Sequence, residues 1–216
     1  MNELNALHAK LQAGLSEMGL DVDAEKQKKL LDYVALIYKW NQVHNLTAVR
    51  EPSDMVTLHL LDSLSVLPYM TSKNLLDVGA GAGLPSIPLA ICLPELQVTA
   101  IDAVQKKVSF MRQAKAQLKL TNFNVVHSRI EDQTVADLNA GKGFELIISR
   151  AFSEIALFIK LTQHLLAHDG VWLAMKGIIP EREFEKACIK PTEIKVLKVA
   201  GLDAERHLIL INKVAI

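Results

Sequence analysis

The 216-residue sequence has few cysteines, no excess of either charge and no long apolar run. Its two cysteines, Cys92 and Cys188, have no paired spacing, and Cys92 lies in an apolar stretch typical of a packed core thiol. No apolar run approaches the roughly 18 residues of a membrane helix, and the spaced N-terminal leucines are unlike a signal peptide. This cysteine usage fits a reducing compartment, so we expect a cytoplasmic protein without a membrane segment.

Lysine plus arginine number 24, as do aspartate plus glutamate, so the formal net charge is zero. No field of the whole molecule therefore attracts a polyanion, and nucleic-acid binding would require a local basic patch. The two cysteines and seven histidines are scattered without the spacing of zinc ligands. We expect no metal site.

The most informative stretch spans residues 74–88, where a short apolar run leads into three alternating glycines and then Pro85. This order predicts a buried parallel strand, a tight turn and a helix that begins near the proline. Glycine permits positive φ and lets a ligand approach the backbone closely. The spacing is neither the G-x-G-x-x-G of dinucleotide-binding proteins nor a phosphate-binding P-loop. The turn glycines are Gly79, Gly81 and Gly83.

An acidic residue, Asp102, ends the second apolar run, about 20 residues after the loop. An acid at this strand tip can accept hydrogen bonds from both ribose hydroxyls. Asp77, the G-x-G-x-G loop and Asp102 together resemble motifs I and II of the S-adenosylmethionine-dependent methyltransferases. The alternative is a glycine turn in another kind of α/β protein.

Residues 1–70 have apolar residues at steps of three and four, which predicts three amphipathic helices. A unit of this size would be only marginally stable alone. We therefore expect an N-terminal helical cap docked on a main domain of residues 71–216. The helix boundaries are predicted at Gly19, at the capping residue Asp23, and at Pro52 and Pro68.

From residue 73 strands and helices alternate, which implies right-handed crossovers and a parallel sheet. The short link at 200–206 predicts an antiparallel hairpin at the end. This α/β pattern resembles the seven-stranded, Rossmann-like fold of class I methyltransferases. Strands are predicted at 74–79, 97–102, 123–127, 144–149, 171–176, 194–199 and 207–213. Helices are predicted at 84–92, 105–119, 152–167 and 180–188.

The sequence disfavours two classes of methyl acceptor. Methylation of a pyrimidine C5 needs a nucleophilic cysteine, and neither cysteine follows a strand tip. Methylation of an exocyclic amine commonly uses an Asn/Asp-Pro-Pro-Tyr-like turn after the fourth strand, where residues 148–152 read Ile-Ser-Arg-Ala-Phe. An acceptor that is already nucleophilic remains, such as a purine N7, which needs positioning rather than a general base.

The chain resembles the bacterial small-subunit ribosomal RNA guanine-N7 methyltransferases, also called the glucose-inhibited division protein B family. The resemblance spans nearly the whole chain, and its most diagnostic elements are Ser149-Arg150-Ala151-Phe152 and Lys176-Gly177. Two positions depart from the family pattern, Ser86 and Ala103, and Ala103 removes a possible hydroxyl contact to the cofactor. Further matching stretches are Lys39-Trp40-Asn41, Asn45-Leu46-Thr47, His59-x-x-Asp62-Ser63, Lys106-Lys107, Phe110-x-Arg112-Gln113, Ser128-Arg129-Ile130-Glu131 and Glu205-Arg206-His207-Leu208.

The resemblance implies S-adenosyl-L-methionine as cofactor and, as partner, 16S ribosomal RNA or the small ribosomal subunit particle. The implied activity is methylation of the N7 of the guanine at position 527 of that RNA. We expect a monomer. Two alternatives remain: a non-catalytic RNA-binding factor in ribosome assembly, and a methyltransferase acting on a small molecule or protein.

The expected site contains no general acid or base. Arg150 and Phe152 are candidates for positioning; the alternative for Arg150 is a surface ion pair, and for Phe152 core packing is an equally good explanation. The expected cofactor-binding residues are Gly79, Gly81, Gly83, Leu84, Asp102, Ile130, Glu131 and Arg150.

Basic residues follow the second strand and lie at other strand ends, where they could contact RNA phosphates. A solvated helix surface is the alternative for those on the helix. His59, Asp62 and Ser63 share one helix face. They could contact the active site or RNA; the alternative is that they link the cap to the main domain. The expected RNA-binding residues are Lys106, Lys107, Arg112, Arg129, Lys176 and Arg206.

Overall fold

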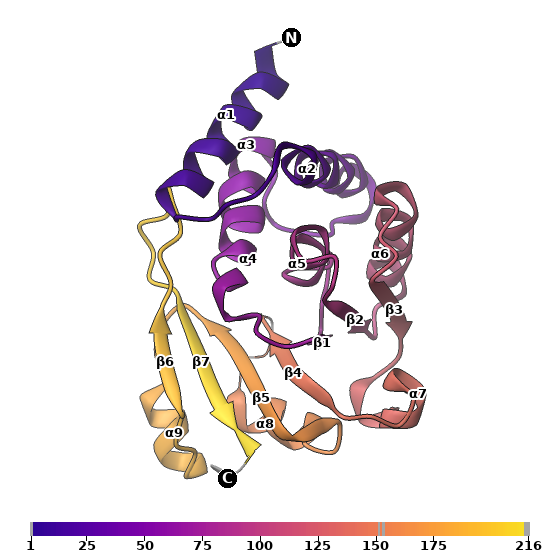
Figure 1. The fold of residues 1–216 in the computed structure, drawn as a ribbon, viewed down its shortest axis with the longest axis vertical. Helices are drawn as coiled ribbons and strands as arrows, with labels where there is room; N and C mark the ends of the chain where they lie inside the picture. The colour runs from indigo at the N-terminus through magenta and orange to yellow at the C-terminus, as the bar shows by residue number, and fades with distance from the viewer. Residues whose placement is uncertain (1, 151, 153, 214–216) are drawn as a thin grey trace.

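A seven-stranded sheet forms the centre of the protein (Figure 1). The computed structural model describes residues 2–150, 152 and 154–213. The strand order is β3-β2-β1-β4-β5-β7-β6; β1 to β5 are parallel, and β7 runs antiparallel to β5 and β6. The predicted parallel sheet and terminal hairpin are confirmed. The strands are β1 (Asn74–Val78), β2 (Gln97–Asp102), β3 (Phe123–His127), β4 (Phe144–Ser149), β5 (Leu166–Lys176), β6 (Glu193–Val196) and β7 (His207–Asn212).

Helices cover both faces of this sheet, as buried parallel strands require. Successive residues of β1 enter different cores: Leu75 belongs to one hydrophobic cluster and Leu76 to the other. The first cluster includes α2 (Ala24–His44), α5 (Ser86–Cys92) and α6 (Gln105–Leu118), and the second includes α7 (Val135–Asn139), α8 (Ile155–Thr162) and α9 (Glu181–Ala187).

The N-terminal helices begin and end close to the predicted positions. Gly19 has φ +67° just after α1 (Asn2–Glu17), and the Asp23 carboxylate accepts a 2.8 Å hydrogen bond from Lys26 N at the start of α2. The third predicted helix is not uniform. It consists of α3 (Pro52–Met55), a π-helical turn (Val56–Leu61), α4 (Asp62–Leu64) and a short 3-10 turn (Leu67–Tyr69).

The largest error of the sequence prediction lies between the fourth and fifth strands. The helix predicted at 152–167 spans only Ile155–Thr162, and β5 begins at Leu166 rather than at residue 171. Leu165 and Leu166 are buried, so their apolar character fitted either element. The pairing shifts register between Phe144 and Leu146. Ser153, within the predicted helix, lies outside the described residues.

Smaller differences concern two other elements. Helix α7 was not predicted, because its short sequence has little apolar periodicity; a capping box between Thr134 and Asp137 begins it. The strand predicted at 194–199 spans Glu193–Val196, and beyond it Leu197 and Val199 are buried in the first cluster.

Candidate functional site

The glycine-loop cavity lies where β1, β2 and β3 end and has a volume of about 310 Å³. Open α/β sheets bind ligands at the carboxyl ends of their strands. The walls are mainly apolar, with one buried carboxylate at Asp102. Residues that line it include Val78, Gly79, Asp102, Ile130, Glu131 and Phe152.

The glycine loop has a backbone that requires glycine. Gly79, Gly81 and Gly83 have φ values of +70°, +61° and +84°, in the region that other residues rarely adopt. A Cβ on Gly83 would lie 2.4 Å from Ile87 Cδ1. The loop is also held from outside, because the Tyr33 hydroxyl donates a 2.6 Å hydrogen bond to the Ala82 carbonyl.

Asp102 joins the loop to the second strand. Its Oδ2 accepts a 2.9 Å hydrogen bond from Gly81 N, and its Oδ1 a 2.8 Å bond from Val104 N. Lys107 Nζ lies 3.9 Å from the same carboxylate. A carboxylate has further lone pairs after two such bonds, so this side chain is already oriented and can still accept hydroxyl donors.

Asp77 lies in β1, immediately before the loop, and is fully buried. Burial raises the pKa of this carboxyl group to about 7, although a 3.3 Å hydrogen bond from Ser86 N favours the ionised form. The Asp77 Oδ1 atom has no hydrogen-bond partner among the described residues. Asp77 therefore connects strand and helix beneath the loop.

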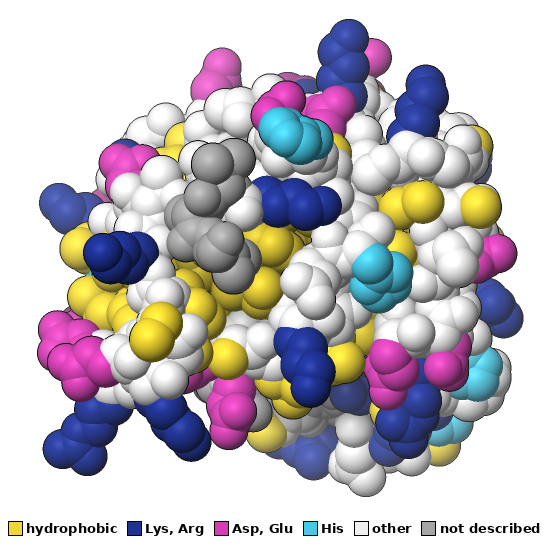
Figure 2. Space-filling model, turned by 90° about the horizontal axis from the view of Figure 1, so that it is seen from below, with side chains coloured by type: hydrophobic (Ala, Val, Ile, Leu, Met, Phe, Trp, Pro, Cys, Tyr) yellow, Lys and Arg dark blue, Asp and Glu magenta, His cyan; other side chains and the backbone are white. Residues whose placement is uncertain are grey.

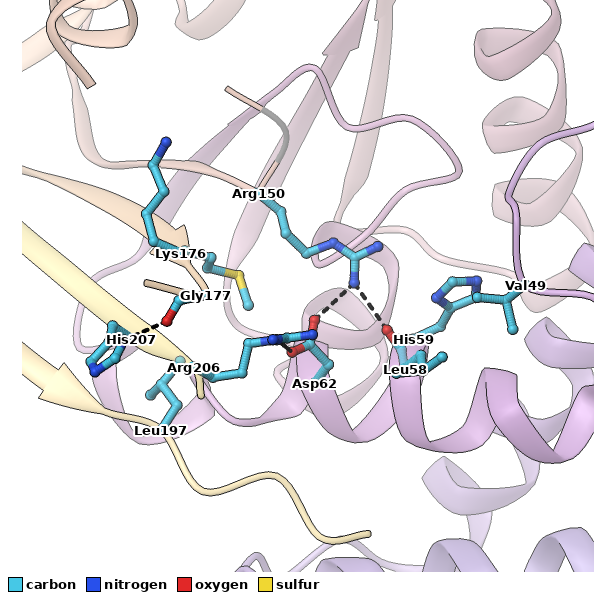
Figure 3. A pocket seen from close by; sticks show the side chains of 11 residues that line it. Val49, Leu58, His59, Asp62, Arg150, Lys176, Gly177, Leu197, Arg206 and His207 are labelled. Carbon is cyan, nitrogen blue, oxygen red and sulfur yellow. Dashed lines mark hydrogen bonds and ion pairs between the residues drawn. The ribbon is translucent and has the colours of Figure 1, made fainter. Parts of the chain in front are cut away.

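The arginine cavity, of about 400 Å³, lies at the ends of β4 and β5 (Figure 3). At its centre Arg150 and Arg206 both point toward Asp62, which lies at the end of the π-helical turn. Arg150 Nη1 is 3.0 Å from Asp62 Oδ2, and Arg206 Nε is 2.9 Å from Asp62 Oδ1. The Asp62 side chain is 5% exposed and each arginine side chain 27%. The helical N-terminal region thus supplies the carboxylate that orients both guanidinium groups.

His59 forms another part of this cavity and is buried. Its Nε2 lies 3.0 Å from the Thr47 hydroxyl. Burial, with a smaller effect of Arg150, lowers the pKa of His59 to about 4. The imidazole is therefore neutral at neutral pH and adds no charge to the cavity.

These features match a known family. A profile described as rRNA small subunit methyltransferase G (GidB) matches residues 26–209. The chain belongs to the rRNA small subunit methyltransferase G family. Proteins named Ribosomal RNA small subunit methyltransferase G from Methylobacillus flagellatus and Laribacter hongkongensis are 60% and 46% identical, over 95% and 94% of this chain and 98% and 97% of their own lengths.

Solved structures agree on the fold. A SAM dependent methyltransferase from Aquifex aeolicus has a TM-score of 0.55 at 20% identity, covering 78% of this chain and 96% of that one. A precorrin-6y C5,15-methyltransferase from Geobacter metallireducens has a TM-score of 0.52 at 14% identity, covering 78% and 91%. The fold is that of the class I S-adenosylmethionine-dependent methyltransferases.

In this member of the methyltransferase G family, the glycine-loop cavity brings together five of the eight expected cofactor residues or their immediate supports. Gly79, Asp102, Ile130 and Glu131 line it, and Gly81 holds Asp102. Arg129 and Phe152 line the same cavity; the Phe152 ring also packs on Phe158, with centroids 5.3 Å apart. Phe152 therefore lines the cavity and also makes the core contact, while its positioning role stays a prediction.

Three expected cofactor residues lie elsewhere. Leu84 is 5% exposed and packs in the first core cluster, since burial of an apolar side chain is favourable. Gly83 shapes the loop and lines neither cavity. Arg150 lines the arginine cavity, because its charge-assisted bond to Asp62 turns it there. Ala151 of the same motif lies outside the described residues.

The expected RNA residues do not form one patch. Lys176 and Arg206 line the arginine cavity, whereas Arg112 lines a separate groove of about 480 Å³ with Lys115 and Lys119. At 1.5 Å per residue, Lys107 and Lys119 lie about 18 Å apart along α6. Figure 2 shows basic and acidic side chains interspersed on the face seen from below. Arg129 lines the glycine-loop cavity and Lys107 lies near Asp102, so the expected RNA-binding residues are spread over several parts of the surface.

The sequence left the role of Asp62 open and did not predict that its carboxylate contacts two arginines far away in the chain. Only its acidic side chain and its place in a stretch that matches the family could have indicated this role. Within 2–150, 152 and 154–213, no group of histidine, cysteine and acidic residues could hold a metal ion. No helix in the same residues is long and apolar enough to cross a membrane.

Proposed function

We propose that this chain transfers a methyl group from S-adenosyl-L-methionine to the N7 of a guanine in small-subunit ribosomal RNA, the guanine at position 527 of 16S RNA. Membership of the methyltransferase G family supports the RNA substrate. The observation that carries the cofactor assignment is Asp102, buried at the cavity wall and already fixed by Gly81 and Val104.

The glycine-loop cavity fits this cofactor. Asp102 would accept the ribose hydroxyls, Val78, Ile130 and Phe152 would wall the adenine, and Gly79 would admit the methionine part near the backbone. When bound, S-adenosylmethionine supplies an electrophilic methyl group on a sulfonium. The cavity volume is within the roughly 300–1,000 Å³ typical of ligand sites.

The residues of the chain contribute position rather than proton transfer. Guanine N7 has a lone pair and loses no proton on methylation, so a base is not required. Neutral His59 and the fixed Asp62–Arg150 pair line the arginine cavity, and Arg150 is two residues from Phe152 of the glycine-loop cavity. Burial raises the pKa of the Cys92 thiol to about 12, which leaves it protonated and unsuited to the covalent chemistry of pyrimidine C5 methylation.

We also propose that residues 1–70 form a helical cap docked on a methyltransferase domain of residues 71–216. The first core cluster supports this, because it joins Leu30 of the cap to Leu75 and Leu208 of the main domain. A ribosomal RNA substrate supports a cytoplasmic location.

The deciding experiment is nucleoside mass spectrometry of small-subunit RNA from cells with and without this protein. Loss of 7-methylguanosine at one position, restored by the wild-type gene and not by an Asp102→Ala variant, is the expected result. Full methylation in the cells that lack the protein would overturn the proposal. Retained methylation with Asp102→Ala would leave the reaction in place and remove Asp102 from cofactor binding.

A further inference from the structure

We infer that the arginine cavity is the binding site for a phosphate group of the acceptor nucleotide, with Asp62 as a positioning residue for Arg150 and Arg206. This inference deepens the proposed function and rests on it. It assigns a chemical role to Asp62 and Arg206, residues that come from opposite parts of the chain.

Both arginines line the cavity and retain hydrogen-bond donors. Arg150 uses Nη1 for Asp62 and for the Leu58 carbonyl at 3.2 Å, and Arg206 uses Nε for Asp62 and Nη1 for the Glu205 carbonyl at 2.8 Å. The described residues provide no partner for the Nη2 group of either arginine. A guanidinium has five N–H donors in a planar fork, so each side chain can still bind an anion.

The charge of the cluster points to an anion. Two guanidinium groups share one carboxylate, and the neutral His59 adds nothing, so the arginines and Asp62 together carry one positive charge in excess at a partly buried place. Lys176, a further basic residue, lines the same cavity. Arginine forks match phosphate oxygens in geometry. Asp62 orients both guanidinium groups before the ligand binds, which lowers the conformational entropy that the side chains lose on binding.

The position of the cavity identifies the phosphate as that of the acceptor. Arg150 in the arginine cavity and Phe152 in the glycine-loop cavity lie two residues apart, just after β4. Lys176 lines the arginine cavity and its Nζ donates a 2.7 Å hydrogen bond to the Phe152 carbonyl. A nucleotide extruded from its strand swings about its own backbone, so its phosphate would stay at the arginines while its base approaches the cofactor cavity.

The π-helical turn supports a functional origin for this arrangement. Such turns are rare and are found frequently at functional sites. Here the turn, Val56–Leu61, carries His59 and leads directly into Asp62. A simple link between cap and sheet would not need two cations on one carboxylate beside a cavity.

The test measures, by NMR titration, how tightly the full chain binds each of two probes, guanosine 5′-monophosphate and guanosine. Wild type should bind the monophosphate at least about tenfold more tightly, the size of a charged hydrogen-bond contribution. Arg206→Gln should remove most of that preference, and Arg206→Lys should restore part of it, because charge returns without the fork. Arg182→Gln, which removes an exposed charge on α9, should keep the wild-type preference.

S-adenosylmethionine affinity is measured in the same variants. If Arg206→Gln weakens cofactor binding as much as nucleotide binding, the arginines serve the cofactor carboxylate and the inference is overturned. Equal affinity of wild type for both probes, or an Arg206→Gln variant that keeps the preference while folded by circular dichroism, also overturns it. Should wild type show the preference but methylate no ribosomal RNA, the phosphate site stands and the proposed function falls.

Discussion

The Tyr33 hydroxyl, on a helix of the N-terminal region, donates a 2.6 Å hydrogen bond to the carbonyl of Ala82 in the glycine loop. Tyr33 is completely buried, and burial raises the pKa of its hydroxyl well above the usual range. The group therefore keeps its proton and remains a donor. The shape of the glycine loop consequently depends on a residue 49 positions away in the sequence.

Replacing Tyr33 by phenylalanine should leave the Ala82 carbonyl without its buried donor. We expect the free energy of unfolding to fall by about 1–3 kcal/mol, and the affinity for S-adenosylmethionine to fall as the loop loosens. Chemical denaturation and titration calorimetry measure the two effects. Tyr38→Phe is the matched control, since that side chain is 42% exposed. Unchanged cofactor affinity in Tyr33→Phe would show that the loop holds its shape unaided.

Asp102→Ala should weaken S-adenosylmethionine binding by about 1–3 kcal/mol, because it removes acceptors for the ribose and the support of Gly81. Calorimetry in the presence of a chelator measures the affinity and tests binding without a metal. The control is Asp21→Ala, at an exposed position before α2. Wild-type affinity in the Asp102 variant would exclude this carboxylate as the ribose acceptor.

Asp77 should make stability depend on pH. Its folded pKa of about 7 lies above the ordinary value of 3.8, so its contribution is complete below about pH 4 and is lost as pH rises toward 7. Asp77→Asn cannot ionise. Its free energy of unfolding relative to wild type should therefore rise between pH 4 and pH 8, by an amount on the order of 4 kcal/mol.

Urea denaturation at several pH values measures this difference. His59 titrates in the opposite sense, since its lowered pKa removes stability as pH falls from 6.5 toward 4. Comparison of the variant with wild type at each pH cancels that contribution. A difference independent of pH would mean that Asp77 is ionised throughout this range.

Two pairs of lysines on α6 allow the RNA surface to be located. Lys106→Ala with Lys107→Ala changes the end nearest Asp102, and Lys115→Ala with Lys119→Ala changes the separate groove by the same charge. If the first pair binds phosphates, its loss should reduce the slope of log affinity against log salt by roughly 0.7 per lost contact with single-stranded RNA.

Filter binding of small-subunit RNA over a range of salt concentrations gives these slopes. We expect the second pair to keep the wild-type slope, because it lies about 12–18 Å further along the helix. Equal changes for both pairs would indicate a general effect of net charge. No change for the first pair would direct the search to Arg129, Lys176 and Arg206.

The sequence was informative where function depends on neighbours in the chain. The glycine loop and Asp102 were predicted because strand, turn and acidic tip follow local rules. The start of β5 was missed, since Leu165 and Leu166 suit a helix and a strand equally.

The arginine cavity could not be predicted from local patterns. Asp62 meets Arg150 and Arg206 across separations of 88 and 144 residues. The sequence predicted Arg150 at the cofactor site, and in the structure its bond to Asp62 places it in the arginine cavity. The π-helical turn was likewise hidden, because its apolar spacing resembles that of an α-helix.

The separation of Asp62 and Arg206 also has a consequence for biosynthesis. Chains grow at about 5–20 residues per second, so the carboxylate is made roughly 7–29 s before its second arginine, 144 residues later. The helical region and the first strands can assemble during this interval, but the arginine cavity then has only part of its charge. A nascent chain therefore lacks Arg206, and with it one of the two guanidinium groups that Asp62 orients in the arginine cavity, until translation is nearly over.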